Sequence, residues 1–198
     1  MDCKDLVKEM RETENPLSQI QIIEMINNKS TFTEKCVLTR RYLTPQSTTI
    51  EKIIKTDLNM GDTKNKTSGD ATKGENNYEI KYSGHSKKSI WNFVQIRPDH
   101  DVQFYLLLGY NLYDKSDKDI GKGYVFKVRA ENMYNLIIDY GGYAHGTIEK
   151  LGKITKYNIK GRNCEYVLRC DPNSKKGKNK EIFNELIKYE VNYSALNF

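Results

Sequence analysis

The chain has 198 residues, enough for one domain with its own core, and 37% of them are hydrophobic. It carries 32 Lys and Arg against 26 Asp and Glu, and this net charge of +6 favours a polyanionic partner such as nucleic acid. The longest apolar run, residues 105–108, is too short to span a membrane, and four scattered cysteines without a Cys-x-x-Cys pair argue against a zinc site.

The N-terminal part, residues 1–58, has the apolar spacing of helices. Its first residues are too charged for a secretory signal, and unpaired cysteines suit a reducing setting, so we expect a cytoplasmic protein. Isoleucines at 20, 22, 23 and 26 predict one helix that ends at residues 27–28. Residues 31–34 (Thr-Phe-Thr-Glu) and 48–51 (Thr-Thr-Ile-Glu) each have the capping-box form, which predicts two further helix starts.

Strands dominate the middle of the chain. A polar loop at 59–77 with a short strand near Asp70 is followed by predicted strands at 78–83, 90–96 and 102–112. The continuous apolar run in the last of these predicts a strand buried on both faces, at the centre of a mixed sheet. A strand at 124–128, a helix at 130–138, basic loops at 143–171 and a closing helix at 182–189 complete the pattern.

We therefore expect a single α/β domain, with a mixed central β-sheet flanked by helices. Its parts are a helical N-terminal part (1–58), a central core (59–140), and a small C-terminal basic β extension with its closing helix (141–198).

One constellation in the core carries chemistry. Asp70 lies at hairpin distance before Glu79-Ile80-Lys81, and strand alternation places Glu79 and Lys81 on one face of the strand. Two carboxylates and one ammonium that converge can hold a divalent cation and stabilise charge at a phosphate. The alternative is an ordinary exposed hairpin with a charged face.

The spacing Asp70-x8-Glu79-Ile80-Lys81 resembles the active-site pattern of the PD-(D/E)XK nuclease superfamily, and the order of helices and strands is similar. Residues 92–98 (NFVQIRP), 101–106 (DVQFYL) and 141–147 (GGYAHGT) resemble blocks of small bacterial type II restriction endonucleases. The resemblance covers roughly residues 60–170 and implies a restriction-endonuclease-like core. One departure is that Gly69, and not proline, precedes Asp70.

The resemblance also implies roles for these residues. Asp70 and Glu79 would bind Mg²⁺ with the backbone carbonyl of Ile80, and Lys81 would orient or deprotonate the attacking water. A glutamate on an early helix would lie near the metal, and the sequence leaves three candidates open: Glu24, Glu34 and Glu51.

Contacts to DNA divide into backbone and base contacts. For the phosphate backbone we expect Lys87, Lys88, Gln95 and Arg97. For base edges we expect donors and acceptors in the C-terminal loops, since Arg pairs with guanine and Asn with adenine. These residues are His145, Lys160, Arg162 and Asn163.

The favoured hypothesis is a magnesium-dependent, sequence-specific endonuclease that cuts double-stranded DNA. It would be a type II restriction enzyme of the bacterial cytoplasm, acting as a homodimer because one catalytic set per chain requires two chains to cut both strands. A repair, nicking or junction-resolving nuclease of the same fold is one alternative. A non-catalytic nucleic-acid-binding protein is another, and a generic domain with a charged hairpin is the last.

Overall fold

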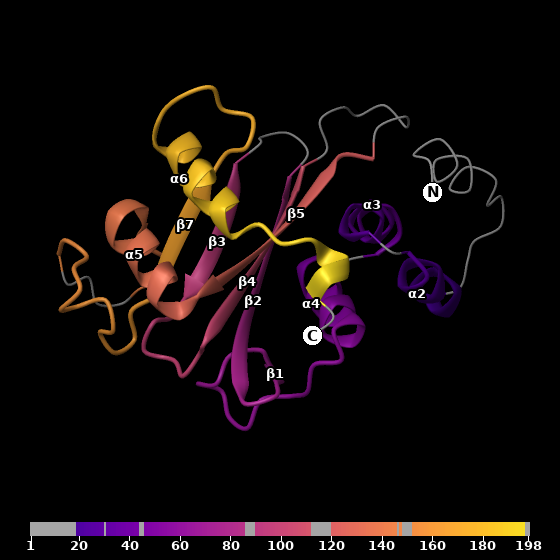
Figure 1. Cartoon of the computed structure of the whole chain (residues 1–198), viewed down its shortest axis with the longest axis horizontal. Coiled ribbons are helices and arrows are strands. Elements are labelled where there is room, and N and C mark those ends of the chain that lie inside the picture. The colour runs from indigo at the N-terminus through magenta and orange to yellow at the C-terminus, as the bar shows by residue number, and fades with distance from the viewer. Residues whose placement is uncertain are drawn as a thin grey trace.

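The computed structural model describes residues 19–29, 31–43, 46–85, 90–111, 120–145, 147 and 152–196, and these form an α/β fold. Figure 1 shows a central sheet with helices α2–α4 on one side, and a second sheet with α5 and α6 on the other. The α/β class and the mixed central sheet expected from the sequence are confirmed. No helix in the described part of the chain is long and apolar enough to cross a membrane.

The helical layer consists of α2 (Gln19–Asn27), α3 (Phe32–Tyr42) and α4 (Gln46–Asp57). The capping box predicted at 31–34 is present, because the Thr31 hydroxyl accepts from the Glu34 N–H and the Glu34 carboxylate accepts from the Thr31 N–H. The second predicted capping box, at 48–51, is wrong. Helix α4 already begins at Gln46, so Thr48 lies inside it and Glu51 is free to point elsewhere.

The central sheet has the order β1 (Ala71–Lys73), β2 (Asn76–His85), β4 (Phe104–Asn111) and β5 (Lys122–Arg129). Strand β2 runs parallel to β4, with Glu79 opposite Tyr105 and Lys81 opposite Leu107, whereas the other pairs are antiparallel. Strand β4 is buried from Tyr105 onward, as its continuous apolar run predicts.

Alternation along β2 divides its side chains between two cores. Ile80 packs with Leu106 and Leu108 against the helical layer. Glu79 and Lys81 lie on the other face, the face from which Tyr105 and Leu107 enter the second core. The charged pair is thus directed toward the second sheet, away from the helices' apolar faces.

The second sheet is antiparallel and has the order β3 (Trp91–Ile96), β7 (Tyr166–Cys170) and β6 (Gly142–Tyr143). The segment predicted as a strand at 90–96 therefore pairs with the C-terminal strand rather than joining the central sheet. Helices α5 (Ala130–Tyr140) and α6 (Lys178–Leu186) pack on it, followed by the short 3₁₀ turns Ile187–Tyr189 and Tyr193–Leu196.

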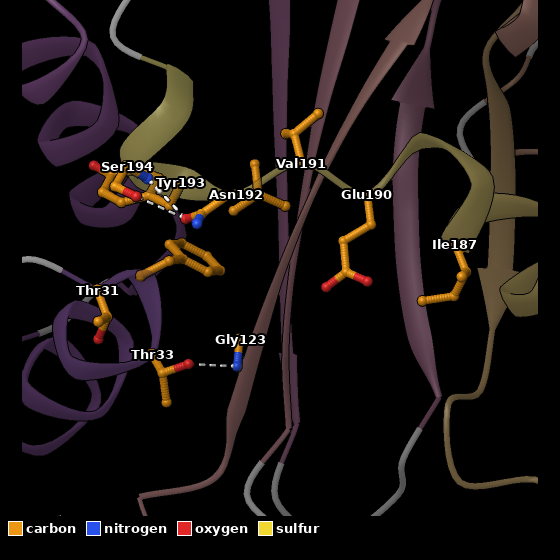
Figure 2. A pocket seen from close by; sticks show the side chains of 11 residues that line it. Thr31, Thr33, Gly123, Ile187, Glu190, Val191, Asn192, Tyr193 and Ser194 are labelled. Atoms are coloured by element: carbon orange, nitrogen blue, oxygen red, sulfur yellow. Dashed lines mark hydrogen bonds between the residues drawn. The ribbon is translucent and has the colours of Figure 1, made fainter. Parts of the chain in front are cut away.

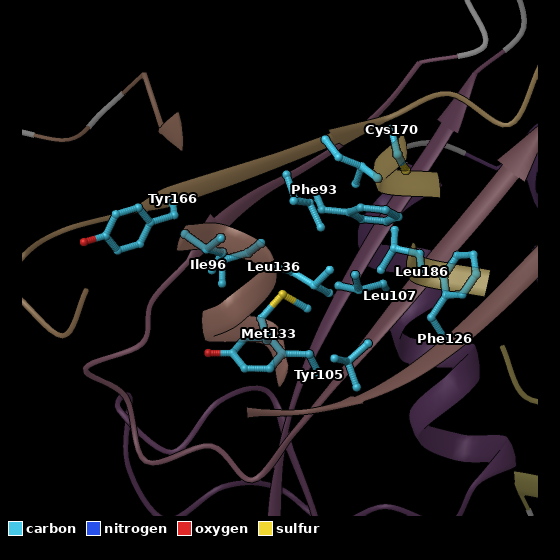
Figure 3. Packing of buried hydrophobic residues seen from close by; sticks show 14 of the residues in the cluster. Phe93, Ile96, Tyr105, Leu107, Phe126, Met133, Leu136, Tyr166, Cys170 and Leu186 are labelled. Carbon is cyan, nitrogen blue, oxygen red and sulfur yellow. The ribbon is translucent and has the colours of Figure 1, made fainter. Parts of the chain in front are cut away.

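Large side chains fill the space between the two sheets (Figure 3). Trp91 lies over Gly109, where a Cβ atom would come within 2.7 Å of the indole ring. Glycine at 109 thus lets the second sheet pack closely on β4, and the position of β3 over the Glu79–Lys81 face of β2 follows from this contact.

Candidate active site

A cavity of about 420 Å³ lies between β2, α4 and β3. Charged residues from β2, from α4 and from the loops beside them line it, which makes it the candidate site. Its lining residues are Thr48, Glu51, Lys66, Gly69, Asp70, Glu79, Lys81, Tyr82, Val94, Gln95, Arg97 and His100.

A larger cavity of about 720 Å³ lies between α3, β5 and the C-terminal segment (Figure 2). Among the described residues that line it, only Glu190 is charged. Size alone would favour this cavity, but it offers no set of acids and bases, so we assign the chemistry to the smaller one.

The outer edge of β2 positions Asp70. The Asp70 N–H donates to the Tyr78 carbonyl at 2.8 Å, which extends the β1–β2 pairing by one step. Beyond Tyr78 this edge has no strand partner in the described part of the chain, and the Ile80 N–H donates instead to the Asp70 carboxylate at 2.8 Å. We call residues 80–82 of this edge the open edge of β2.

The backbone at residue 69 explains why glycine, and not proline, precedes Asp70. Its φ is +76°, in the left-handed region, and a Cβ atom there would lie 2.6 Å from the Tyr78 carbonyl oxygen. The backbone approach that delivers Asp70 to the open edge is therefore available to glycine but not to larger residues.

Glu51 reaches the same edge from α4. The backbone of Tyr82 stabilises its carboxylate and so lowers its pKa, and Asp70 and Glu51 thus serve neighbouring edge-facing residues of β2. The structure thus distinguishes among the three early-helix glutamates. Glu34 is engaged in the capping box, Glu24 is exposed on α2, and Glu51 lines the cavity.

Glu79 and Lys81 form the buried part of the site. Their side chains are only 4% and 16% exposed, and the Lys81 ammonium lies 2.5 Å from Glu79 Oε1 and 3.5 Å from Asp70 Oδ2. This burial differs from the alternative expected from the sequence, an ordinary exposed hairpin with a charged face. The ammonium lies between two carboxylates that would otherwise repel each other.

Burial and mutual repulsion shift the acidity of these groups. Burial raises the pKa of Glu51 to about 7, with Asp70 adding to the shift and Lys81 opposing it. Burial also raises the pKa of Glu79, although Lys81 opposes it. Burial alone would lower the pKa of Lys81, but the charges of Glu79 and Asp70 outweigh it and the pKa rises, so Lys81 stays charged.

The donor chemistry fits a hard divalent cation. The donors are carboxylate oxygens of Asp70, Glu79 and Glu51, and the Ile80 carbonyl faces the same edge as its N–H. In the described part of the chain, however, no three His, Cys, Asp or Glu side chains are arranged as a ready metal site. Lys81 bridges Glu79 and Asp70, so cation binding requires the ammonium to move aside.

His100 is a cavity residue that the sequence analysis missed. It follows the turn after Arg97, and its Nδ1 is buried without a hydrogen-bond partner in the described part of the chain. Its charged form lowers the pKa of Glu79. A histidine two residues before the predicted central strand was the available signal, but only the fold shows that this turn reaches Glu79.

The expected DNA contacts divide into those at the cavity and those away from it. Gln95 and Arg97 line it, but the Arg97 guanidinium is paired with Glu165 at 2.5 and 2.9 Å. Four expected base contacts lie outside the cavity lining: His145, Lys160, Arg162 and Asn163. Lys160 lies over the Tyr134 ring, in a neighbouring hollow that shares His100. Lys87 and Lys88 fall outside the described residues.

Glu165 connects the two groups of residues. Its backbone carbonyl accepts from the Ala144 N–H and from the Thr147 hydroxyl, while its carboxylate binds Arg97. The loop at 160–163 is thus joined through Glu165 to the end of β3 and to the segment at 144–147.

No protein-family model, curated protein or solved structure matches this chain, so function is inferred from the geometry and charge of this site.

Proposed function

We propose that this protein is a magnesium-dependent endonuclease that hydrolyses phosphodiester bonds in double-stranded DNA. The main support for the proposal is that Asp70, Glu79 and Lys81 line one cavity. The Asp70 carboxylate accepts a hydrogen bond from the backbone N–H of Ile80, which lies between Glu79 and Lys81. This is the arrangement that the resemblance to PD-(D/E)XK nucleases implies. The net charge of +6 supports a polyanionic substrate.

Asp70 and Glu79 would hold the cation together with the Ile80 carbonyl, and Glu51 would support it from α4. Bound Mg²⁺ lowers the pKa of a coordinated water and polarises the scissile phosphate. Lys81 carries its proton, so in its resting state it is suited to neutralise charge on the phosphate and to orient the nucleophile.

The burial of the Glu79 carboxylate argues against a protein that only binds DNA. Glu79 is buried, and a carboxylate near a nucleic-acid phosphate repels it unless a cation lies between them. A protein that only binds DNA gains nothing from acids placed at this depth. Burial is the main cause of the raised pKa values of Glu51 and Glu79, so holding these acids at this depth costs free energy, as is common at catalytic sites.

Among nucleases we favour the type II restriction kind, acting as a homodimer in the bacterial cytoplasm. One acid–lysine set per chain cuts one strand, and a two-fold symmetric pair cuts both strands of a palindrome. A repair, nicking or junction-resolving enzyme would use the same site on other substrates.

Digestion of supercoiled plasmid with Mg²⁺ tests the proposal. Discrete bands support a restriction enzyme, and a nicked circle alone supports a nicking enzyme. A plasmid panel that stays supercoiled with Mg²⁺ and with Mn²⁺, while the protein is folded, contradicts the nuclease assignment.

A further inference from the structure

Strand β3 has a bulge beside the candidate active site. Its pairing register with β7 shifts between Phe93 and Ile96, and both of these residues are fully buried in the second core. The two residues between them, Val94 and Gln95, are exposed. Gln95 has φ +56°, in the left-handed region that a side chain of this size rarely adopts.

The bulge turns both side chains into the cavity. Val94 and Gln95 line the same cavity as Asp70, Glu79 and Lys81. Val94 is 38% exposed, one of few large apolar side chains in the described residues that face solvent. The Gln95 amide has no hydrogen-bond partner in the described part of the chain. Bulges beside active sites commonly redirect side chains in this way.

The chemistry of the pair suits a base edge better than a phosphate. A phosphate offers only acceptors and a negative charge, and neither an apolar Val nor a neutral amide is a strong partner for it. Arg97, the cation that directly follows the bulge on this segment, is already paired with Glu165. An amide beside an apolar group matches the major-groove edge of an A·T pair, because glutamine binds adenine N6 and N7 and an apolar side chain contacts the thymine methyl.

We propose that the β3 bulge, Val94 and Gln95, reads an A·T base pair next to the scissile phosphate. This inference rests on the proposed nuclease function. Proximity follows from the shared cavity, and rigidity follows from the buried anchors at Phe93 and Ile96, which fix the pair against the second sheet.

The test selects bound duplexes from a randomised pool, in Ca²⁺ so that cleavage does not interfere, and compares wild type with Gln95→Gly and Gln95→Glu. Glycine removes the side chain and accepts the positive φ, so the backbone is not strained. Asn92→Ala is the matched control, on an exposed position of β3 outside the cavity lining.

Wild type and Asn92→Ala should select A·T at one position. Gln95→Gly should lose discrimination there by about 5- to 100-fold, and Gln95→Glu should shift the preference toward C·G, since glutamate accepts from cytosine N4. An unchanged selection pattern in both Gln95 variants overturns the inference and leaves the nuclease assignment intact. Absence of any DNA binding and cleavage by wild type overturns both.

Discussion

The two edges of the central sheet satisfy their unpaired backbone groups with different partners. At the β5 edge, the Gly123 N–H donates to the Thr33 hydroxyl and the Val125 carbonyl accepts from the Val191 N–H, so neutral groups cover the edge (Figure 2). At the open edge of β2, the Ile80 amide donates to the Asp70 carboxylate, and the backbone of Tyr82 stabilises the carboxylate of Glu51.

The difference shows what stability alone requires. Backbone groups at a strand edge need hydrogen-bond partners, and a hydroxyl or a passing backbone supplies them without charge. Carboxylates at the β2 edge are costly, because burial and the charge of Asp70 raise the pKa values of Glu51 and Glu79 while the Lys81 ammonium only partly opposes this. We therefore infer that the acids at the β2 edge serve a reaction, since neutral partners are enough to satisfy the other edge.

Removing an acid of the β2 edge should have the largest effect. Glu79→Gln should lower the cleavage rate at least about 10³-fold, because it removes a proposed cation ligand while keeping the shape of the side chain. Binding to DNA should persist in Ca²⁺. Glu190→Gln, beside the covered β5 edge, is the control and should cleave normally. An equal loss of cleavage rate in both variants would contradict a special role for the acids of the β2 edge.

Removing the ammonium should affect both rate and stability. Lys81→Met should slow cleavage by about 10²–10⁴-fold. It should also destabilise the metal-free protein by about 1–3 kcal/mol, because Glu79 and Asp70 lose their shared partner. Single-turnover kinetics and thermal melting measure the two effects. A normal rate with a lowered melting temperature would make Lys81 structural only.

The pKa of Glu51 predicts a pH dependence of stability. Its folded value of about 7 exceeds the ordinary 4.5, so the folded protein holds more protons between these values. Its contribution is therefore full below about pH 4.5 and is lost as pH rises to about 7. Melting curves of Glu51→Gln should decline less over this window than those of wild type and of the exposed control Glu24→Gln. Parallel curves for all three would contradict the assigned environment.

The smallest expected effect concerns Arg97. Arg97 forms an ion pair with Glu165 on a partly exposed surface, so a double-mutant cycle on the free energy of unfolding should give a coupling of about 1 kcal/mol between them. The cleavage rate of Arg97→Ala should change by less than about tenfold. If Arg97→Ala weakens binding to all duplexes and flattens its salt dependence while Glu165→Ala does not, Arg97 contacts phosphate, as the sequence suggested.

Local patterns were enough to predict the parts of the site that lie close in sequence. Alternation along β2 placed Glu79 and Lys81 together, and the apolar run identified β4 as the buried central strand, which the structure places beside β2. The turn at 74–75 is short, so Asp70 could reach the same point. These predictions needed only strand periodicity and hairpin reach.

Contacts between distant segments could not be predicted in the same way. Glu51 occupies the last position of a capping-box pattern, yet α4 begins earlier and directs it to β2. Strand β3 left the central sheet because Trp91 packs over Gly109 and β7 offers a partner far along the chain. Nothing local to Val94 indicates the cavity that it shares with His100, and the sequence around His100 does not show that its turn reaches Glu79.

Cation binding tests the central claim most directly, because it does not require the recognition sequence. Calorimetric titration of Mn²⁺ into wild type, Asp70→Asn and the control Asp62→Asn, whose side chain is 95% exposed, compares an edge acid with a surface acid. Wild type and Asp62→Asn should bind the cation, and Asp70→Asn should lose most of the affinity. Equal binding by Asp70→Asn and wild type would contradict the assignment of the β2 edge as a catalytic metal site.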